Sequence, residues 1–247
     1  MSLPQQPGDE VVSYQKLRTF IGLIGIGLPV AAVLGCFIKG DGIYAIQTSI
    51  SHYYYTKMHI VFVGILCVLG GFLINYKGKD NWESRLSNFA GVCAFGIATC
   101  PTRIKFFLPT ANNDAANQYL MVFKPISLRM NSVHFAFAAL LFTCFVLFCL
   151  VFFQTPDEPP ANNDEFIKLK RRQRFYKICG WGIAVSIASI ALCNFVLDKY
   201  FSGWFLTFST IIFETTALWF FGSTWLLKGS KYWSKYPLLR PLLKYYR

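Results

Sequence analysis

Long apolar runs, separated by short charged segments, make up most of this 247-residue chain. A helix needs about 20 predominantly apolar residues to cross about 30 Å of hydrocarbon, and in lipid its backbone groups must be satisfied within the segment. Six runs reach or approach that length; they lie at about residues 19–38, 58–76, 86–102, 131–153, 178–197 and 201–227. The sequence therefore predicts an all-α fold, a polytopic transmembrane bundle of six helices in a single domain that covers residues 1–247.

The basic residues divide unequally between the two sides that successive spans define. If the N-terminus is cytoplasmic, 17 of the 24 Lys and Arg residues are cytoplasmic: Lys16, Arg18, Lys77, Lys79, Arg85, Lys168, Lys170, Arg171, Arg172, Arg174, Lys177, Lys228, Lys231, Lys235, Arg240, Lys244 and Arg247. The other seven are Lys39, Lys57, Arg103, Lys105, Lys124, Arg129 and Lys199. Because short cytoplasmic loops carry the excess of Lys and Arg, both termini are predicted to be cytoplasmic in a multi-pass protein of the cell inner membrane.

The net charge of +12 is explained by contact of basic residues with anionic membrane lipids. The segment 228–247 mixes aromatic and basic residues, a composition that favours an interfacial cytoplasmic tail lying on anionic inner-leaflet lipids. Neither this tail nor the basic run at 168–177 belongs to a nucleic-acid-binding module, so nucleic acid is not a predicted partner. The predicted partners are the lipid bilayer and its anionic lipids, and the sequence leaves a homo-oligomer open.

All eight cysteines lie inside predicted spans, where free thiols act as small apolar packing residues, so no disulfide framework is expected. The string Val33-Leu34-Gly35-Cys36 looks like the lipobox of a bacterial lipoprotein signal peptide. A first transmembrane helix is the favoured interpretation, because the run is long enough to span and five more follow it. Whether this string is processed is left open.

Glu214 is the only acidic residue within a predicted span. It lies near the middle of the sixth run and shares a helical stripe with Thr207 and Thr210, which predicts a polar pocket continuous toward the outer face. An ionisable group inside a membrane is rare and often functional. Glu214 could carry a proton, bind an ion, act as a catalytic acid or brace two helices.

The segment before the second span adds hydroxyl and imidazole groups. If that helix begins early, Ser49, His52, Thr56 and His59 share one face, and the topology places His134 at the same outer end of the bundle. The predicted pocket is therefore lined by Ser49, Ser51, His52, His59, His134, Thr210 and Glu214.

Three histidines are enough to hold a catalytic zinc ion, and Glu214 could then serve as general acid or base. No His-x-x-x-His or His-Glu-x-x-His pair places two ligands on one helical turn, however. No cofactor is therefore predicted, and zinc is kept as an alternative with His52, His59 and His134 as candidate ligands.

Two spans have distinctive patterns. The first contains Gly22, Gly25, Gly27 and Pro29, which predict a weakened or kinked helix. The fourth is rich in bulky aromatic residues and is predicted to face lipid over much of its surface; these are Phe135, Phe137, Phe142, Phe145, Phe148, Phe152 and Phe153.

Several short strings carry a family resemblance: Ser49-Ile50-Ser51 followed by Tyr53-Tyr54, Pro101-Thr102, His134, Glu214, Trp219, Phe221-Gly222-Ser223, Trp225 and Lys228-Gly229. With these strings the chain resembles, over nearly its whole length, an uncharacterised group of bacterial six-span inner-membrane proteins, which implies the fold but no activity. It is more remotely similar to the CREST-type membrane hydrolases, which have a buried Ser, an Asp and three His. The chain departs from that pattern because it has six predicted spans rather than seven and no paired histidines in its last helix.

Three functions remain open. The favoured one is an outward-facing polar pocket within the bundle that binds or passes a small solute, an ion or a lipid head group. The alternatives are a metal-dependent membrane hydrolase of a lipid amide or ester, and a structural or partner subunit of a membrane complex. The first is favoured because the hydrolase needs a ligand spacing that the sequence lacks.

Overall fold

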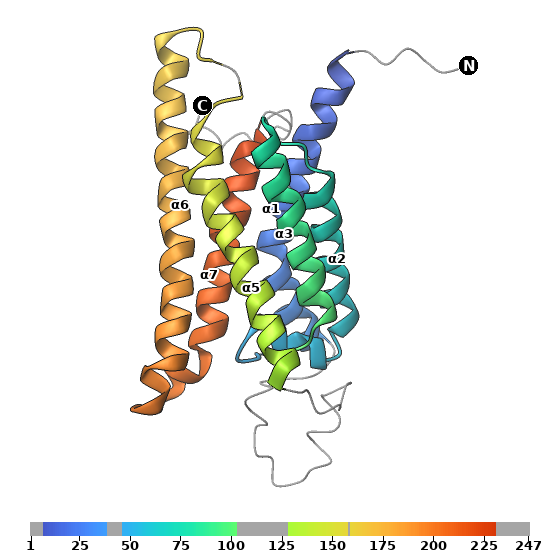
Figure 1. Ribbon diagram of the computed structural model, residues 1–247, viewed down its shortest axis with the longest axis vertical. Helices are drawn as coiled ribbons and strands as arrows, with labels where there is room; N and C mark the ends of the chain where they lie inside the picture. Colours follow the sequence, from blue (N-terminus) through green and yellow to red (C-terminus); the bar gives the residue numbers. More distant parts are fainter. Residues whose placement is uncertain (1–6, 39–45, 103–127, 158, 231–247) are drawn as a thin grey trace, which may run out of the picture.

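The computed structural model describes residues 7–38, 46–102, 128–157 and 159–230. Within those residues the chain is helical and has no strand. The α-helices and short 3-10 helices (η) follow in the order α1 (Pro7–Ile38), η2 (Ile50–Tyr55), α2 (His59–Asn75), α3 (Asn81–Thr99), α5 (Leu128–Leu150), η3 (Phe152–Gln154), α6 (Asn163–Phe195), η4 (Leu197–Lys199) and α7 (Trp204–Lys228) (Figure 1).

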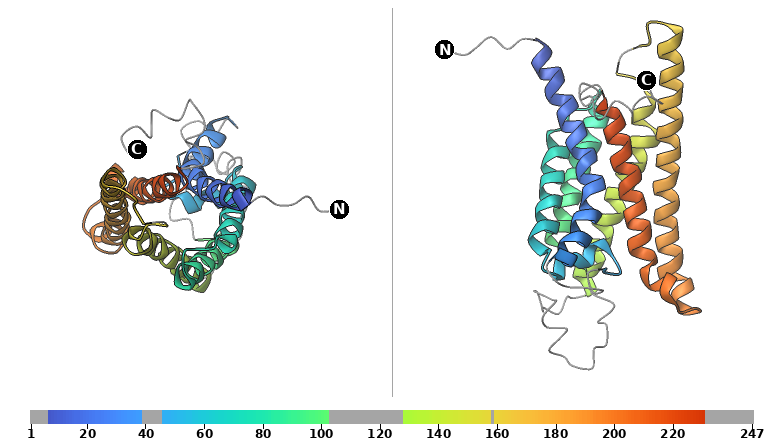
Figure 2. Two further views of the ribbon diagram at one scale, coloured as in Figure 1. Left: turned by 90° about the horizontal axis from the view of Figure 1, so that it is seen from above. Right: turned by 180° about the vertical axis from the view of Figure 1, so that it is seen from behind.

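The α-helices form a closed ring in chain order. Helix α1 packs against α2 and α7, α3 packs against α2 and α5, and α6 packs against α5 and α7. Figure 2 shows this ring from above, with α1 and α7 side by side although they are the first and last helices. The ring therefore brings residues from both ends of the chain into contact.

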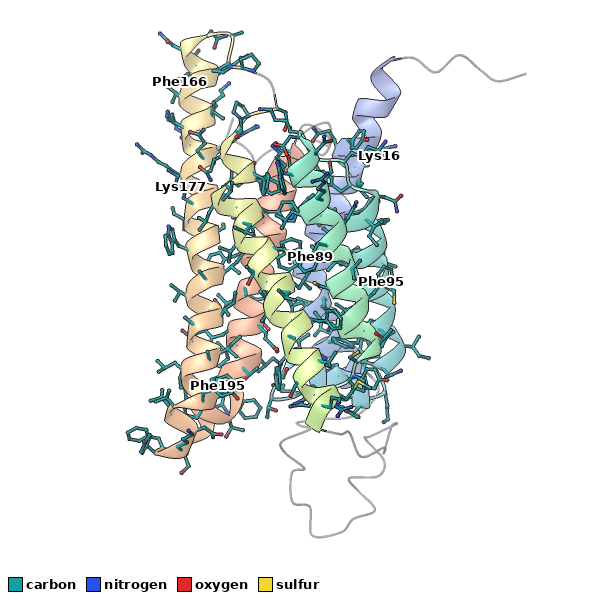
Figure 3. All side chains as sticks on the ribbon, in the orientation of Figure 1. Lys16, Phe89, Phe95, Phe166, Lys177 and Phe195 are labelled. Carbon is teal, nitrogen blue, oxygen red and sulfur yellow. The ribbon has the colours of Figure 1, made fainter. Side chains whose placement is uncertain are left out.

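The two ends of the ring differ in chemistry. The first turns of α1, the last turn of α7, the α2–α3 turn and the α5–α6 connection lie at one end, and η2 and η4 lie at the other (Figure 1). Lys16 and Lys177 lie toward the first end and Phe195 toward the second (Figure 3). We call the end that holds the first turns of α1 the basic end, and the end that holds η2 the η2 end.

Among the described residues, four helices are long and apolar enough to cross a membrane: Tyr14–Ile38, Arg129–Gln154, Asn163–Lys199 and Trp204–Lys228. The second predicted span forms the shorter apolar helix His59–Asn75. The third forms α3, which begins with polar residues and is capped by the Asp80 carboxylate, which accepts a hydrogen bond from Glu83 N at 2.8 Å. The part of the chain that the structure describes is thus all-helical, with several helices suited to a bilayer.

An aromatic plug fills the middle of the ring. It consists of Phe145, Phe148, Phe153, Phe221 and Trp225, each at most 2% exposed. The Phe145 and Phe221 rings stack with their centroids 3.6 Å apart, and Trp225 meets the Phe148 ring edge-on at 5.4 Å. The prediction that the aromatic residues of the fourth span face lipid is therefore wrong for Phe145, Phe148 and Phe153, because their side chains occupy the space enclosed by the ring of helices. Phe135 is exposed, as predicted.

Small residues allow the helices to touch backbone to backbone. A Cβ atom added to Gly22 of α1 would lie 2.7 Å from the Gly222 carbonyl oxygen of α7, and one added to Gly222 would lie 2.6 Å from the Gly22 oxygen. Helix α1 continues through Pro29, so neither the glycines nor the proline ends it. At Gly22 the glycine provides close packing of the kind common between membrane helices.

The lipobox-like string lies within α1, where Cys36 is fully buried and its Sγ lies 3.6 Å from the Thr56 hydroxyl. All eight cysteines are free thiols. The predicted interfacial tail lies mostly at 231–247, outside the described residues.

Candidate functional site

The Glu214 carboxylate of α7 lies against the start of η2. The Ser49 hydroxyl lies 2.9 and 3.1 Å from the two Glu214 oxygens and donates to them, and the Ile50 backbone N–H donates to Glu214 Oε2 at 2.7 Å. Ser49 is the N-cap of η2, and its hydroxyl oxygen also accepts from Ser51 N at 3.2 Å. The carboxylate thus faces the interior of the ring and is bound by one hydroxyl and one backbone donor.

A backbone hydrogen bond also joins α7 to the start of η2. The Ile211 N–H of α7 donates to the Thr48 carbonyl oxygen at 3.1 Å, outside its own helix. Helix α7 therefore holds the start of η2 through both main-chain and side-chain bonds.

His134 of α5 contacts η2 from the other side of the ring. It is 2% exposed, its Nδ1 lies 2.6 Å from the Cys100 carbonyl oxygen, and its Nε2 lies 3.0 Å from Ser51 Oγ. Because a carbonyl oxygen can only accept, Nδ1 carries the ring proton and Nε2 accepts from the Ser51 hydroxyl. We call the set Ser49, Ile50, Ser51, His134 and Glu214 the η2 network; it joins three elements that are far apart in sequence.

Neighbouring residues brace this network. The Tyr55 hydroxyl donates to the Thr102 carbonyl oxygen, and the Thr102 hydroxyl donates to Asn131 Oδ1 at 3.0 Å. Burial, with a smaller contribution from Tyr54, raises the pKa of Tyr55 to about 12, so the hydroxyl stays a donor at neutral pH. Sequence reasoning did not include Cys100, Thr102 or Asn131 in the site. Their position at the outer ends of predicted spans was the signal that could have found them.

Three of the predicted pocket residues point elsewhere. His52 Nδ1 lies 2.9 Å from the Thr48 hydroxyl, His59 contacts the Tyr54 carbonyl and ring, and Thr210 accepts from Asn194 of α6 at 2.8 Å. The predicted common helical face is wrong, because residues 50–55 form a 3-10 helix and α2 begins only at His59. The network therefore contains Ser49, Ser51, His134 and Glu214 of the predicted set.

No group of three His, Cys, Asp or Glu side chains suited to a metal ion occurs within the part of the chain that the structure describes. His134 directs one ring nitrogen to a carbonyl and the other to a hydroxyl. Zinc binding through His52, His59 and His134 stays a prediction that requires metal analysis.

The aromatic plug lies between the η2 network and the basic end. Phe221 and Trp225 follow Glu214 by 7 and 11 residues on the same helix, which corresponds to about 10 and about 16 Å along its axis. A polar molecule that enters from the η2 end therefore meets large buried rings beyond Glu214.

A second polar cluster lies at the basic end. Asp157, in the α5–α6 connection, accepts from Arg18 Nη1 at 2.7 Å and from Lys228 Nζ at 2.8 Å, and Arg18 also donates to the Tyr76 hydroxyl at 3.2 Å. Burial works to raise the pKa of the Asp157 carboxyl group, but the charges of Lys228 and Arg18 outweigh burial and hold the pKa below its ordinary value. This cluster ties α1 and α7 to the α5–α6 connection.

Comparison of the chain with protein-family models, with curated proteins and with solved structures found no match. The resemblances drawn from short strings of residues stay predictions.

Proposed function

We propose that this chain is a six-span protein of the cell inner membrane with both termini cytoplasmic, and that the η2 network is a binding site open to the outer side. The site binds or passes a small solute, an ion or a lipid head group. The gathering of basic residues at one end of the ring supports this orientation.

The observation that carries the proposal is the contact between Glu214 and η2. A carboxylate in a long apolar helix is costly unless it is bound by donors, and here Ser49 and Ile50 supply them. A carboxylate is an acceptor, so the chemistry that suits it is a cation, an ammonium group or a hydroxyl group. The aromatic plug beyond Glu214 favours binding over passage.

The proposal is tested with the purified full-length protein. Uptake of protons, Na⁺ and K⁺ is measured in proteoliposomes, and thermal stabilisation by choline, ethanolamine and glycerol is measured in detergent. We expect at least one of these responses in the wild type and its loss in Glu214→Gln. Thr216→Val is the matched control on the same helix, because the Thr216 hydroxyl bonds only to Ile212 of its own helix.

If no response depends on Glu214 while Glu214→Gln lowers the melting temperature, the residue is a brace and the proposal is wrong. The structural or partner subunit is then the better assignment.

The orientation has its own test. Cysteines introduced at Lys57, beside η2, and at Lys79, in the α2–α3 turn, are treated with a membrane-impermeant maleimide in intact cells whose outer membrane has been permeabilised. The wild type gives the background from its own thiols. We expect label at position 57 and none at position 79; the reverse pattern would invert the topology.

The hydrolase alternative is favoured by one specific observation, the contact of Ser51 with a histidine oriented by a carbonyl group. In that function Ser51 Oγ attacks the carbonyl carbon of a lipid ester or amide, and its proton passes to His134 Nε2. The histidine then protonates the leaving alcohol or amine, and water hydrolyses the acyl-serine to release the acid and restore the hydroxyl.

A fluorophosphonate probe tests this alternative, because it labels activated serines. Labelling that is lost in both Ser51→Ala and His134→Gln supports hydrolysis, whereas an absence of labelling favours the binding site. Metal analysis of the wild type and His134→Gln tests the metal-dependent form separately: stoichiometric zinc lost with His134 would support it.

A further inference from the structure

A pocket of about 330 Å³ opens at the basic end, between the first turns of α6, the α5–α6 connection and α1. Its volume lies at the lower limit of sites for small ligands, which begins at about 300 Å³. Gln15, Asp157, Lys168, Arg172, Tyr176 and Lys228 are among its lining residues. We call it the basic-end pocket.

The charges around this pocket are only partly matched within the protein. Asp157 is bound by Arg18 and Lys228, and Glu165 Oε2 accepts from the Ala161 N–H at 2.8 Å, so both acidic groups of the lining already have donors. Lys168 and Arg172 have no carboxylate partner among the described residues. Arg172 Nη2 donates to the Ser230 hydroxyl at 3.4 Å, a neutral partner that does not offset its charge, and both cations lie in the wall where an anion can meet them.

Two buried polar atoms in the lining residues lack partners. Gln15 is 9% exposed, and its Oε1 atom is buried without a hydrogen bond; Arg172 Nε is likewise buried and unbonded. The first atom needs a donor and the second needs an acceptor. Both atoms are closed to solvent, so a ligand in the pocket reaches them only when the two side chains turn toward it; a ligand that satisfies both carries an anionic oxygen together with a hydroxyl or ammonium group.

The surroundings favour a lipid as the source of that ligand. The N-terminal parts of α6 and α1 extend beyond the other helices of the ring (Figure 1), and that of α6 carries Phe166 and Ile167, which are 48% and 50% exposed. Apolar side chains beside a run of basic residues are typical of segments that lie at a membrane surface. The pocket thus opens beside a surface suited to acyl chains.

We propose that the basic-end pocket binds the head group of a glycerophospholipid. The phosphate is held by Arg172 and Lys168, and a hydroxyl or ammonium group of the head group donates to Gln15 Oε1. Arg172 can present its guanidinium to two phosphate oxygens at once, which suits the recognition of a phosphodiester. The site is separate from the η2 network, so it does not depend on the function proposed there.

The test uses the full-length protein in detergent and native mass spectrometry to measure binding of phosphatidylglycerol. The pocket variant is Lys168→Gln with Arg172→Gln. The matched control is Lys170→Gln with Arg171→Gln, which removes the same charge from the same helix turns at exposed residues outside the pocket lining. We expect the pocket variant to weaken binding at least about tenfold, because it removes charge-assisted hydrogen bonds, and the control to change it less than about twofold.

Equal weakening in both double variants would mean that the basic run attracts lipid by charge alone, and would overturn the pocket. A third variant, Gln15→Leu, leaves all charges unchanged, and we expect it to weaken phosphatidylglycerol more than phosphatidic acid, whose head group lacks the added hydroxyl groups. Equal effects on the two lipids would contradict the role given to Gln15.

The same measurement with sn-glycerol 3-phosphate separates a lipid from a soluble phosphate ester. We expect no saturable binding of the soluble compound at concentrations at which the lipid saturates. Tight binding that is lost in the pocket variant would overturn the assignment to a lipid. Circular dichroism of each variant checks that helix content is unchanged, so that loss of binding is not loss of fold.

Discussion

The two ends of the ring differ in how their buried polar groups are bonded. At the η2 end, Glu214 and His134 are bound by hydroxyl and backbone groups of η2 and its neighbours. At the basic end, Asp157 is held by two cations, and among the described residues the buried side-chain atoms without partners are all on this half: Gln15 Oε1, Arg18 Nε, Arg172 Nε and Trp225 Nε1.

This difference indicates different roles. A network whose groups are all bonded holds its elements in one arrangement, whereas unpaired buried atoms are costly and mark places where a ligand contributes binding energy. At the η2 end a ligand has to replace hydrogen bonds that Glu214 already accepts, whereas at the basic end it can bond to Gln15 Oε1 and Arg172 Nε, which have no partner. Substitutions at each end, and one that affects both ends, test this contrast.

Gly22→Leu is expected to have the largest effect, a loss of about 3 kcal/mol in unfolding free energy or failure to accumulate. The added side chain would meet the α7 backbone at Gly222, and α7 carries both Glu214 and Lys228. Gly27→Leu is the matched control, because a Cβ added at Gly27 meets nothing within 4 Å. Unfolding in detergent measures both, and equal losses would contradict close contact between α1 and α7.

Glu214→Leu is expected to cost about 2–3 kcal/mol, because it leaves the Ser49 hydroxyl and the Ile50 N–H without their acceptor. Glu214→Gln keeps one carbonyl acceptor and is expected to cost less than half as much. If the two variants unfold alike, hydrogen bonding by this side chain does not stabilise the η2 end.

Asp157→Asn is expected to cost about 1–2 kcal/mol at neutral pH. The partners Arg18 and Lys228 are nearly buried, which increases the cost of removing the charge, but the Asp157 side chain is 38% exposed and solvent reduces it. The unfolding free energy in detergent is compared with that of Asp80→Asn, a carboxylate that bonds only within its own turn.

The stability difference between the wild type and Asp157→Asn is also expected to depend on pH. The pKa of Asp157 is lowered in the folded protein, so its contribution to stability is present above the ordinary carboxyl pKa of about 3.9 and is lost as the pH falls through the folded value. The difference in melting temperature between the wild type and Asp157→Asn should therefore be constant near neutral pH and shrink below about pH 4. A difference that grows as the pH falls would have the wrong sign.

Ser51→Ala is expected to have the smallest effect, about 1 kcal/mol, because it removes one hydroxyl bonded to a nearly buried histidine. Thr143→Val is the control, since the Thr143 hydroxyl is exposed and bonds within its own helix, and its effect should lie within about 0.5 kcal/mol. If Thr143→Val lowers the unfolding free energy as much as Ser51→Ala or more, the Ser51 hydroxyl does not stabilise the network.

The sequence predicted the helical class and part of the η2 network for identifiable reasons. Glu214 stood out because charge is rare in apolar runs, and Ser49, Ser51 and His134 lie at the ends of spans that topology brings together. The helix boundaries were less accessible: α6 begins at Asn163 rather than near residue 178, because its basic first half favours a helix without adding hydropathy.

Other features left no pattern in the sequence. Lipid and the interior of the ring are equally apolar, so hydropathy could not distinguish Phe145 and Phe148, which form the plug, from the exposed Phe135. The Cys100 carbonyl and the Ile50 N–H act through the backbone, which every residue has. The break between η2 and α2 depends on the Thr56 backbone, which is extended, in a segment whose spacing also fitted a continuous helix.

A double-mutant cycle between Ser49→Ala and Glu214→Leu tests the central claim most directly, because the two side chains meet at 2.9 Å although they are 165 residues apart. We predict an interaction free energy of about 1–2 kcal/mol in detergent unfolding. Additive effects, within about 0.5 kcal/mol, would show that the carboxylate and η2 do not meet, and would contradict this account.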